Sequence, residues 1–332
     1  MTELETNPSV SFVVATYNRS DDLVEAIDSI LDQHHRPIEI IIISNSTDDD
    51  HEHEKEWFCE EGQFDRAEVR YCHFAERMGA PKAKNRGLEQ ATGEIIVQLD
   101  DDAVIKDPSA TDCIIETFRE HKDVGIQAFQ SRNYHTDELK RDEVPDPPEF
   151  EMTPTTAYRT TNFIGLGVAF RRDVLEKTGL YPENFVYGFE EMDLSFRVHD
   201  TGYDILYTPS VAIHHKKAPE GRLSSIETKE RLVENRIKLA LRNLPWRYVV
   251  FTTLFWSVYG LVLTRQFASL VRIYRRLYAS WREALTARHV VSARTIARIK
   301  SRKTMLFCWW YGPHPRRLLG PDGDAERLFW ET

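Results

Sequence analysis

The chain has 332 residues, 41% hydrophobic and 29% charged, so it can bury a large core as one α/β domain with an appendage or as two domains. Its four cysteines have neither metal-site spacing nor a paired framework, which excludes a disulfide-stapled fold and favours free thiols in a reducing compartment. The polar, acidic segment Met1–Pro8 has no features of a signal peptide, so we expect the functional site to face the cytosol.

The first part of the chain alternates strand and helix patterns. Ile38–Ile43 is almost all isoleucine, which is typical of a parallel strand buried on both faces. Ser20-Asp21-Asp22 is a helix-start signal for a helix that ends near Leu31. Further strands are expected at Val10–Ala15, Val69–Phe74, Ile95–Leu99 and Val124–Phe129, and further helices at Lys82–Gln90 and from Pro108. This alternation predicts an α/β fold with a doubly wound sheet.

A segment without periodicity, Lys140–Pro154, is rich in Pro, Asp and Glu and predicts a mobile surface loop. Beyond it comes the segment Phe163–Arg171, after which we expect helices at Arg172–Thr178 and Glu190–Asp200 and strands at Tyr203–Tyr207 and Val211–His215. The body formed by these elements is expected to end near residue 244, with a separate helical region at 245–332.

Charge divides the chain into an acidic body and a basic tail. Arg265–Lys303 holds nine Arg and two Lys against one Glu, a net +10, whereas residues 1–264 carry −19. Just before the basic segment, Tyr248–Thr264 is seventeen residues without a charge, which is the lower limit for spanning a bilayer. The tail therefore favours an anionic partner, either a membrane surface or nucleic acid; no base-reading motif supports nucleic acid.

A single membrane span conflicts with this charge pattern. One crossing at Tyr248–Thr264 would put the acidic body and the basic segment on opposite sides, although basic flanks stay cytoplasmic. We therefore expect an interfacial or re-entrant segment on the cytoplasmic face of the cell membrane, with basic helices on anionic headgroups. The aromatic patch Met305–Tyr311 suits the same interface. The alternative is a core helix packed on the body.

Three consecutive carboxylates, Asp100-Asp101-Asp102, follow the apolar run Ile95–Leu99. The carboxyl ends of strands are where open α/β sheets bind their ligands. Hard oxygen ligands there suit a divalent cation that in turn binds phosphate. Taken alone, the three residues fit a solvated acidic loop equally well.

Five segments in order carry a resemblance to a known family. The chain resembles glycosyltransferase family 2, the inverting nucleotide-sugar enzymes of the GT-A fold, which is a Rossmann-like mixed sheet. The resemblance covers roughly Val10 to His215. The matching segments are Val10–Arg19, Lys84–Leu88, Gly93–Asp102, Gly165–Arg171 and Gly188–Arg197. Each is a weak signal alone, and their order makes the resemblance specific.

This resemblance implies a site for Mg²⁺ or Mn²⁺. The family's D-x-D motif matches Asp100–Asp102, which implies Asp102 as the metal ligand and Asp100 as a ribose contact. Asp101 is grouped with the donor-binding residues, with an orientation away from both as the alternative. A histidine at the position of His215, or of its neighbour His214, completes the metal site in several members. A neutral imidazole is a competent ligand for Mn²⁺; a hydrogen-bonded structural histidine is the alternative.

Other residues are expected on the donor side. Thr16 and Asn18 follow the first strand, with turn chemistry as the alternative. Lys84 can place a cation near the diphosphate, or it is an exposed helix lysine. The family usually has an Asp-rich turn after the second strand, and this chain has Ser-Asn-Ser-Thr at 44–47. Ser44 or Asn45 is the expected substitute there, with Asn45 grouped among the donor-binding residues, which leaves the choice among UDP, GDP and dTDP donors open.

Single-displacement transfer needs a base for the acceptor hydroxyl. The family has a Glu-Asp pair where this chain has Glu190-Glu191, and its second member is the usual base. The choice between Glu190 and Glu191 stays open, and helix N-terminal charge complementarity alone also explains acids there. Gly165 and Gly167 would permit close approach of the acceptor, or they mark a turn or bulge. Asp193 and Arg197 fit an (i, i+4) structural pair.

These patterns together predict an inverting glycosyltransferase that uses a nucleotide-sugar donor. The membrane tail points to a polyprenyl- or dolichyl-phosphate-linked glycan as acceptor, in protein glycosylation or surface polysaccharide assembly. Two alternatives are a metal-dependent phosphohydrolase and a non-catalytic membrane adaptor. The phosphohydrolase leaves the Gly165–Arg171 segment and the tail unexplained, and nothing in the sequence indicates a decayed site.

Overall fold

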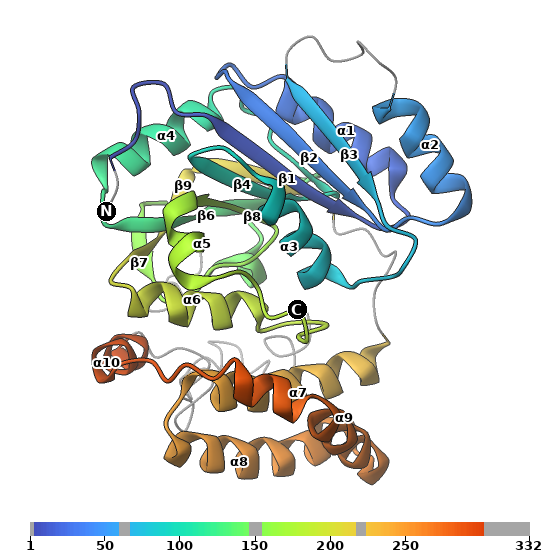
Figure 1. Ribbon diagram of the computed structural model, residues 1–332, viewed down its shortest axis with the longest axis vertical. Helices are drawn as coiled ribbons and strands as arrows, with labels where there is room; N and C mark the ends of the chain where they lie inside the picture. Colours follow the sequence, from blue (N-terminus) through green and yellow to red (C-terminus); the bar gives the residue numbers. More distant parts are fainter. Residues whose placement is uncertain (1–2, 60–66, 146–154, 217–223, 302–332) are drawn as a thin grey trace.

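The computed structural model describes residues 3–59, 67–145, 155–216 and 224–301. In these residues nine strands form one mixed sheet in the order β3-β2-β1-β4-β8-β6-β9-β5, with β7 beside β9 (Figure 1). The strands are β1 Val10–Thr16, β2 Ile38–Ser44, β3 Glu68–His73, β4 Ile95–Asp100, β5 Ala103–Val104, β6 Val124–Asn133, β7 Tyr158–Thr160, β8 Gly167–Arg171 and β9 Asp204–His215. The helices are α1 Ser20–Leu31, α2 Asp48–Phe58, α3 Ala80–Gln90, α4 Ala110–Glu120, α5 Arg172–Thr178, α6 Glu190–Asp200, α7 Ser225–Asn243, α8 Trp246–Thr264, α9 Phe267–Thr286 and α10 Ala293–Ser301, with a 3₁₀ turn at Arg141–Glu143.

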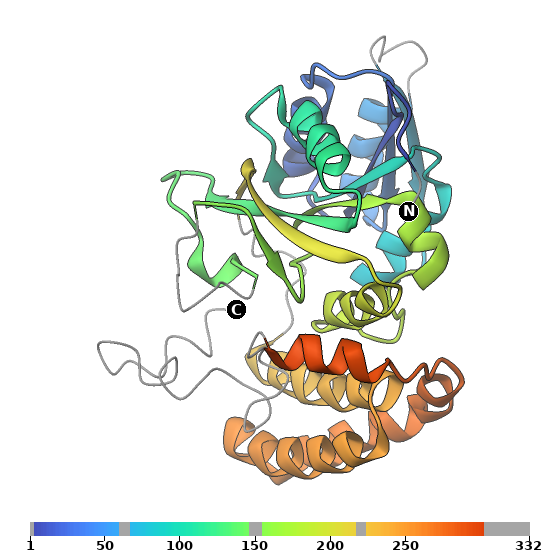
Figure 2. The ribbon, with the colours of Figure 1, turned by 90° about the vertical axis from the view of Figure 1, so that its left-hand side faces the viewer.

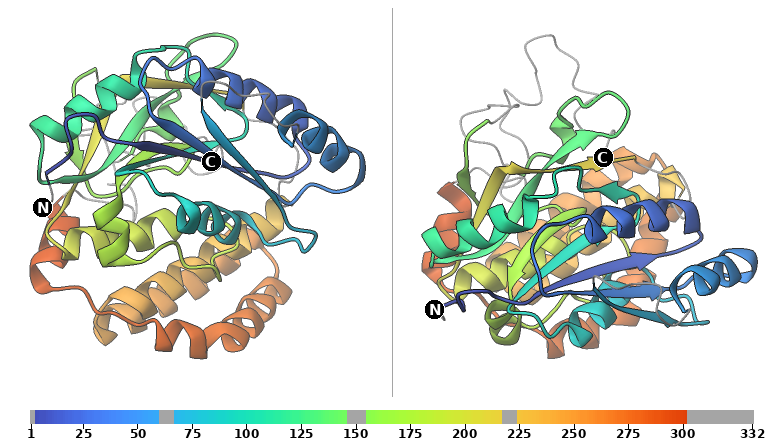
Figure 3. Two further views of the ribbon diagram at one scale, coloured as in Figure 1. Left: turned by 45° about the horizontal axis from the view of Figure 1, so that its top comes forward. Right: turned by 90° about the horizontal axis from the view of Figure 1, so that it is seen from above.

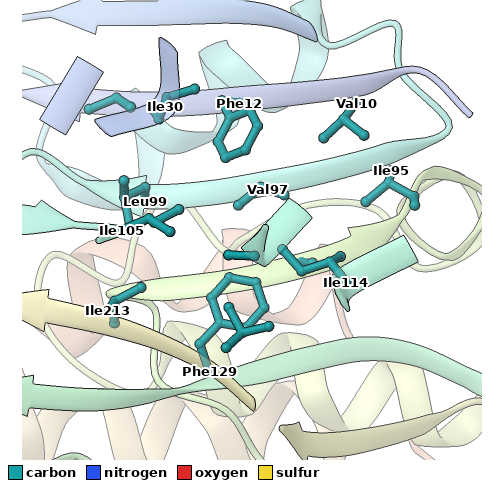
Figure 4. Close-up of a cluster of buried hydrophobic side chains, with 14 of the residues drawn as sticks. Val10, Phe12, Ile30, Ile95, Val97, Leu99, Ile105, Ile114, Phe129 and Ile213 are labelled. Atoms are coloured by element: carbon teal, nitrogen blue, oxygen red, sulfur yellow. The ribbon is translucent and has the colours of Figure 1, made fainter. Parts of the chain in front are cut away.

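The sheet buries both of its faces, because successive side chains of a strand point to opposite sides. On one face, Phe12 and Val97 pack with residues of α1 and α4 in a continuous apolar cluster (Figure 4). On the other face, Val13 and Ile41 pack with residues of α3, α5 and α6. All seven residues of β2 are buried, as the isoleucine run predicts.

Strands β3, β2, β1 and β4 run parallel, and β8 then enters antiparallel between β4 and β6. This reversal makes the sheet mixed, as predicted. One predicted boundary was wrong. The two strands expected at 203–215 are one strand, β9, with a register shift opposite Phe129 and Gln130. Strand β8 begins at Gly167, inside the segment Phe163–Arg171.

Helices after residue 224 form a separate layer. Helix α7 packs on α6 and also on α8 and α9, so it joins the layers on either side of residue 244. Figures 1 and 2 both place α8 at the end of the molecule opposite the parallel strands, with α7 between α8 and the body. The left-hand view of Figure 3 shows the same orange helices together below the blue and green sheet.

Helix α8 is the one described helix that is long and apolar enough to cross a membrane. It covers the whole of the predicted uncharged run. Only 33% of its most apolar window is buried, because one side packs on α7 and the other is exposed. The predicted patch Met305–Tyr311, and the 146–154 part of the predicted loop, lie outside the described residues.

Candidate functional site

Parallel pairing brings the ends of three strands to one edge of the sheet. Thr16 at the end of β1 lies opposite Ser44 of β2, and Asp100 of β4 lies opposite Ala15. The short strand β5 then pairs with the end of β9, with Ala103 opposite His215. The three aspartates at the end of β4 are therefore held between the loops that follow β1 and β2 and the end of β9.

Lys84 links α3 to the first of these aspartates. Its ammonium lies 2.9 Å from Asp100 Oδ1 and donates to the Gly165 carbonyl at 3.2 Å. Burial would lower the pKa of Lys84, but the charges of Asp100 and Glu191 outweigh burial, so the pKa lies above its ordinary value. Lys84 is thus a fixed cation inside the site and not an exposed helix lysine.

The Glu190–Glu191 pair opens α6 and faces the same cation. A left-handed Phe189 (φ 72°) redirects the chain into the helix, so both carboxylates fall in its first turn. Glu190 is buried with 9% exposure, and its Oε2 has no hydrogen-bond partner among the residues that the structure describes. Glu191 is half-buried, so it is the member of the pair that solvent or an acceptor can reach.

Burial raises the pKa of both carboxyls above the usual range of a glutamate. For Glu190 the charge of Glu191 adds to this rise, whereas for Glu191 the Lys84 ammonium opposes it. A carboxylate with a raised pKa that is also partly accessible has the properties of a general base near neutral pH.

Gly165 lies where a side chain would collide with this pair. A Cβ built on Gly165 would come within 2.5 Å of Glu191 Oε1 and 3.3 Å of Lys84 Nζ. Gly165 is therefore part of the cluster that contains Lys84, Asp100 and Glu191. Gly167 is not: its Cβ would meet Ile213 Cδ1 at 2.6 Å, so its lack of a side chain serves core packing.

The second aspartate pairs with an arginine from the loop after β1. Arg19 Nη1 lies 2.8 Å from Asp101 Oδ1 and 3.7 Å from Asp102 Oδ2. Burial raises the pKa of Asp101 to about 7, and the Arg19 charge opposes that rise. Asp101 thus pairs with Arg19, whereas Asp100 pairs with Lys84.

Asp102 and His215 form the start of a chain of polar contacts. Asp102 Oδ1 lies 3.4 Å from His215 Nε2, and His215 Nδ1 lies 2.9 Å from Glu143 Oε1. Glu143 is buried and also accepts a hydrogen bond from Ser131. Burial would lower the pKa of His215, but hydrogen bonds to Asp102 and Glu143 raise it to about 9. His214 instead contacts Asp137, at 2.8 Å, so of the two histidines His215 is the one at the aspartates.

These contacts fit a divalent cation in part. Neighbouring ligand atoms around an octahedral Mg²⁺ stand about 3 Å apart, close to the spacing of the Asp102 oxygen and the His215 nitrogen. A carboxylate on the other ring nitrogen is the usual outer partner of a metal-binding histidine, and Glu143 occupies that position. Within the described part of the chain, no group of three or more His, Cys, Asp or Glu side chains is arranged to hold a metal.

Asn18 and Asn45 hold together the loops that follow β1, β2 and β3. The Asn18 backbone N–H donates to Ser46 Oγ at 2.8 Å, with Asn18 itself in the left-handed region. The Asn45 amide donates to the Glu76 carbonyl at 2.8 Å and accepts from the Met78 N–H. The structure brings Thr16, Asn18 and Asn45 to the same edge, and the Asn45 side chain faces the segment after β3.

Four residues at the site escaped the sequence analysis: Arg19, Gln98, Glu143 and Tyr181. Gln98 donates to the Gly165 carbonyl, and the Tyr181 hydroxyl is buried near Glu190 and Glu191. Arg19 stood inside the motif Val10–Arg19 and was not singled out. The polarity of Gln98 in an otherwise apolar strand was a usable signal, whereas nothing local distinguishes Glu143 in an acidic loop.

With this geometry in hand, solved structures define the class of fold. The chain shares the GT-A glycosyltransferase fold with a mannosyltransferase from Pyrobaculum calidifontis solved with GDP-Man and Mn²⁺ (TM-score 0.54, 18% identity, 90% of this chain and 80% of that one). It also matches Staphylococcus aureus TarS 1–349 solved with UDP-GlcNAc (TM-score 0.56, 15% identity, 90% of this chain and 86% of that one).

The family follows from the sequence. Residues 11–179 match the model of glycosyl transferase family 2, and the chain belongs to that family, as predicted. A glucosyl-dolichyl phosphate glucuronosyltransferase from Haloferax volcanii is 24% identical over 224 residues, 62% of this chain and 69% of the relative. The uncharacterized glycosyltransferase YibD of Escherichia coli K12 is 26% identical over 229 residues, 63% of this chain and 64% of the relative.

Proposed function

We propose that the protein transfers a sugar, with inversion, from a nucleotide-sugar donor to a hydroxyl of a polyprenyl- or dolichyl-phosphate-linked glycan. Residues 1–244 would carry out catalysis, and 245–332 would hold the enzyme on the cytoplasmic face of the cell membrane. The pathway would be protein glycosylation or surface polysaccharide assembly. The observation that carries this proposal is the carboxylate pair Glu190–Glu191 with raised pKa values, converging with Lys84 on the aspartates at the carboxyl edge of the sheet.

In the proposed reaction, Glu191 takes the proton from the acceptor hydroxyl. The hydroxyl oxygen then attacks the anomeric carbon on the face opposite the nucleoside diphosphate, and the bond to that leaving group breaks in the same step. Glu190 would stay buried behind Glu191 and help keep the pKa of the pair raised. The Lys84 ammonium favours the ionised form of Glu191, which keeps the base available.

Donor binding would use the other half of the site. Asp100 would contact the ribose, Asp101 would hold Arg19 at the diphosphate, and Asp102 with His215 would hold Mg²⁺ or Mn²⁺. The cation would supply Lewis-acid stabilisation of the leaving diphosphate. Support comes from the 3.4 Å Asp102–His215 contact and from the Mn²⁺ and GDP-Man in the P. calidifontis mannosyltransferase.

Support for a lipid-linked acceptor is of two kinds. The H. volcanii relative is named for a glucosyl-dolichyl phosphate acceptor. The apolar helix α8 lies on the same chain as the site, and membrane docking raises the effective concentration of a lipid-borne acceptor.

The test is a donor screen on membranes enriched in the full chain, with Mn²⁺ or Mg²⁺ and extracted polyprenyl-linked glycans. We expect one labelled sugar to enter the lipid fraction, and Glu191→Gln to reduce that rate by about 10²- to 10⁴-fold, the contribution of a general base. Glu176→Gln is the matched control, because Glu176 is an exposed α5 carboxylate in a surface pair. Loss of transfer on chelation would support the cation.

Two outcomes would contradict the proposal. Release of free sugar or phosphate without transfer to any acceptor would point to hydrolysis. No metal-dependent turnover with any donor would favour a membrane adaptor.

A further inference from the structure

The largest exposed apolar surface in the described residues lies on α8 and α9. Ten large hydrophobic side chains there are between 41% and 79% exposed, out of fifteen in the described residues as a whole. We call these ten the α8–α9 face: Trp246, Val250, Leu254, Val258, Val262, Phe267, Val271, Tyr274, Tyr278 and Trp281. A surface of this extent on a soluble protein marks a binding site for a membrane or a partner.

The spacing on each helix gives a continuous stripe. The five α8 residues recur every fourth position, and the five α9 residues recur at alternating steps of four and three, so each set lies along one side of its helix. The helices contact each other, and Ser257 Oγ lies 2.6 Å from Tyr274 OH. The two stripes therefore belong to adjacent helices of one layer.

The charge around this face is predominantly positive. From Trp246 through Arg282 the sequence contains six arginines and no Asp, Glu or Lys, and the one acid of α8 and α9 is Glu283. Arg247, Arg265, Arg275 and Arg282 are exposed beside the apolar stripes. A second copy of the chain would bring a second positive face, so self-association is disfavoured, whereas anionic headgroups complement both the charge and the apolar stripes.

Packing against α7 fixes the orientation of α8. The Arg236 guanidinium of α7 lies 3.6 Å from the centre of the Trp256 ring, and Gly260 fits against Val233. Glu230 of α7 pairs with Arg272 at 2.6 Å and with Arg276 at 3.0 Å. The inner side of the α8–α9 layer is therefore held by a helix with buried charges.

If α8 spanned the bilayer, it would either lose its contacts with α7 or draw α7 into the hydrocarbon core with it. Glu230, Glu234 and Lys238 of α7 are each at most 3% exposed, and charged side chains at the bilayer centre are costly. Helix α8 is also followed directly by the exposed Arg265. The apolar side is thus available to lipid only if the helix lies parallel to the membrane.

We infer that the α8–α9 face docks in the plane of an anionic bilayer, with the arginines at the headgroups and α8 lying flat rather than spanning. This inference rests on the proposed membrane location and specifies its geometry. The occupant is a bilayer that contains anionic lipid.

Binding is tested by sedimentation of the full chain with phosphatidylcholine vesicles, with and without phosphatidylglycerol. We expect binding to the anionic vesicles that weakens with salt. Arg275→Gln with Arg282→Gln should lower that partition roughly 30-fold, and Leu254→Asp with Val258→Asp on the order of 100-fold. Trp57→Asp, an exposed aromatic on α2 at the other end of the molecule (Figure 1), is the control and should change nothing.

Depth distinguishes lying flat from spanning. Spin labels are placed singly at positions 250, 254, 258 and 262, in a variant whose four native cysteines are replaced by serine. A flat helix puts all four at one shallow depth. A spanning helix separates the first from the last by about 18 Å, at 1.5 Å per residue, and that result would overturn the inference.

Two further results would also overturn it. The face is a self-association surface if the lipid-free chain is a dimer that Leu254→Asp with Val258→Asp dissociates and no vesicle binding occurs. A chain that transfers sugar in detergent but does not bind anionic vesicles would contradict this inference and the proposed membrane attachment, and would leave the proposed transfer reaction standing. Vesicle binding without sugar transfer would support this inference and contradict the proposed transfer reaction.

Discussion

At the scale of single residues, the site separates into two groups that share the aspartate run. Lys84, Asp100 and Glu191 surround Gly165 on one side, and Asp101 with Arg19 and Asp102 with His215 lie on the other. Adjacent residues at a strand end point in different directions, so one motif serves both groups. The sequence implied this division for Asp100 and Asp102, but it did not provide the partner of Asp101.

Glu143 is expected to act on a bound cation through His215. Its carboxylate holds His215 Nδ1 at 2.9 Å and leaves Nε2 directed at Asp102. Glu143→Gln should weaken Mn²⁺ binding about 10- to 100-fold, measured by titration calorimetry of the donor-free chain. Asp142→Asn, at the neighbouring position in the same turn, is the control. Unchanged Mn²⁺ affinity in Glu143→Gln would show that the contact is structural.

At the scale of elements, α6 is the helix on which the site depends. Its first turn supplies the carboxylate pair, and its buried Asp193 connects it to two other segments. Asp193 pairs with Arg197 at 2.9 Å, as the (i, i+4) spacing predicted, and also with Arg242 of α7 at 2.8 Å. The second pair was not readable from spacing, because the two residues are 49 positions apart.

Removal of Asp193 should therefore destabilise the whole fold. Asp193→Ala leaves the buried Arg242 and the partly buried Arg197 without their carboxylate, so the free energy of unfolding should fall by about 3–5 kcal/mol. Denaturant titration followed by circular dichroism measures this loss. Glu176→Ala, which breaks the exposed Arg172–Glu176 pair, should cost less than about 1 kcal/mol. Equal effects of the two substitutions would contradict the assignment.

His199 on the same helix gives a pH dependence of stability. Burial lowers its pKa from 6.5 to about 4, and the nearby Arg298 charge adds to this. Between those values the unfolded chain binds the proton and the folded chain does not, so this group makes stability fall as the pH falls from about 6.5 to about 4. The loss is about 3 kcal/mol. Denaturant titrations at several pH values measure this loss. In His199→Gln the free energy of unfolding should fall less between pH 6.5 and 4 than in the unsubstituted chain. The same fall in both chains would refute the role of His199.

At the scale of the whole molecule, the body and the C-terminal layer share a helix. α7 lies within the proposed catalytic region, yet its buried Val233 and Ile237 pack with Trp256 of α8 and Ile273 of α9. Core packing therefore extends across residue 244, and the division that we propose there concerns function and not folding.

A chain cut after residue 244 should accordingly be less stable than the full chain. The cut exposes Val233 and Ile237 and removes Arg272 and Arg276, the partners of buried Glu230 and Glu234. We expect a lower midpoint of thermal unfolding and a tendency to aggregate. A chain cut after residue 301 is the comparison. An unchanged midpoint for the 1–244 chain would mean that the body folds without the layer.

Many of the strands and helices could be predicted from the sequence because their residue patterns are local. The isoleucine run of β2, the apolar run of β4 and the Glu190–Asp200 helix all appear where their patterns predict, since burial selects side chains over a few consecutive residues. The continuity of β9 was misjudged, because pairing with neighbouring strands sets the length of a strand. Helices α2 and α7 were missed, since many charged residues obscure their patterns.

The sequence by itself determined the family, the mixed α/β fold and the set of acidic and basic groups at the strand ends, because order and spacing along the chain carry that information. Only the tertiary structure decided which of these groups meet: Lys84 with Asp100, Arg19 with Asp101, and Glu143 with His215. It also decided that α8 has one covered and one exposed side. These contacts join residues far apart in sequence, and their energies depend on burial and distance, which arise only when the chain folds.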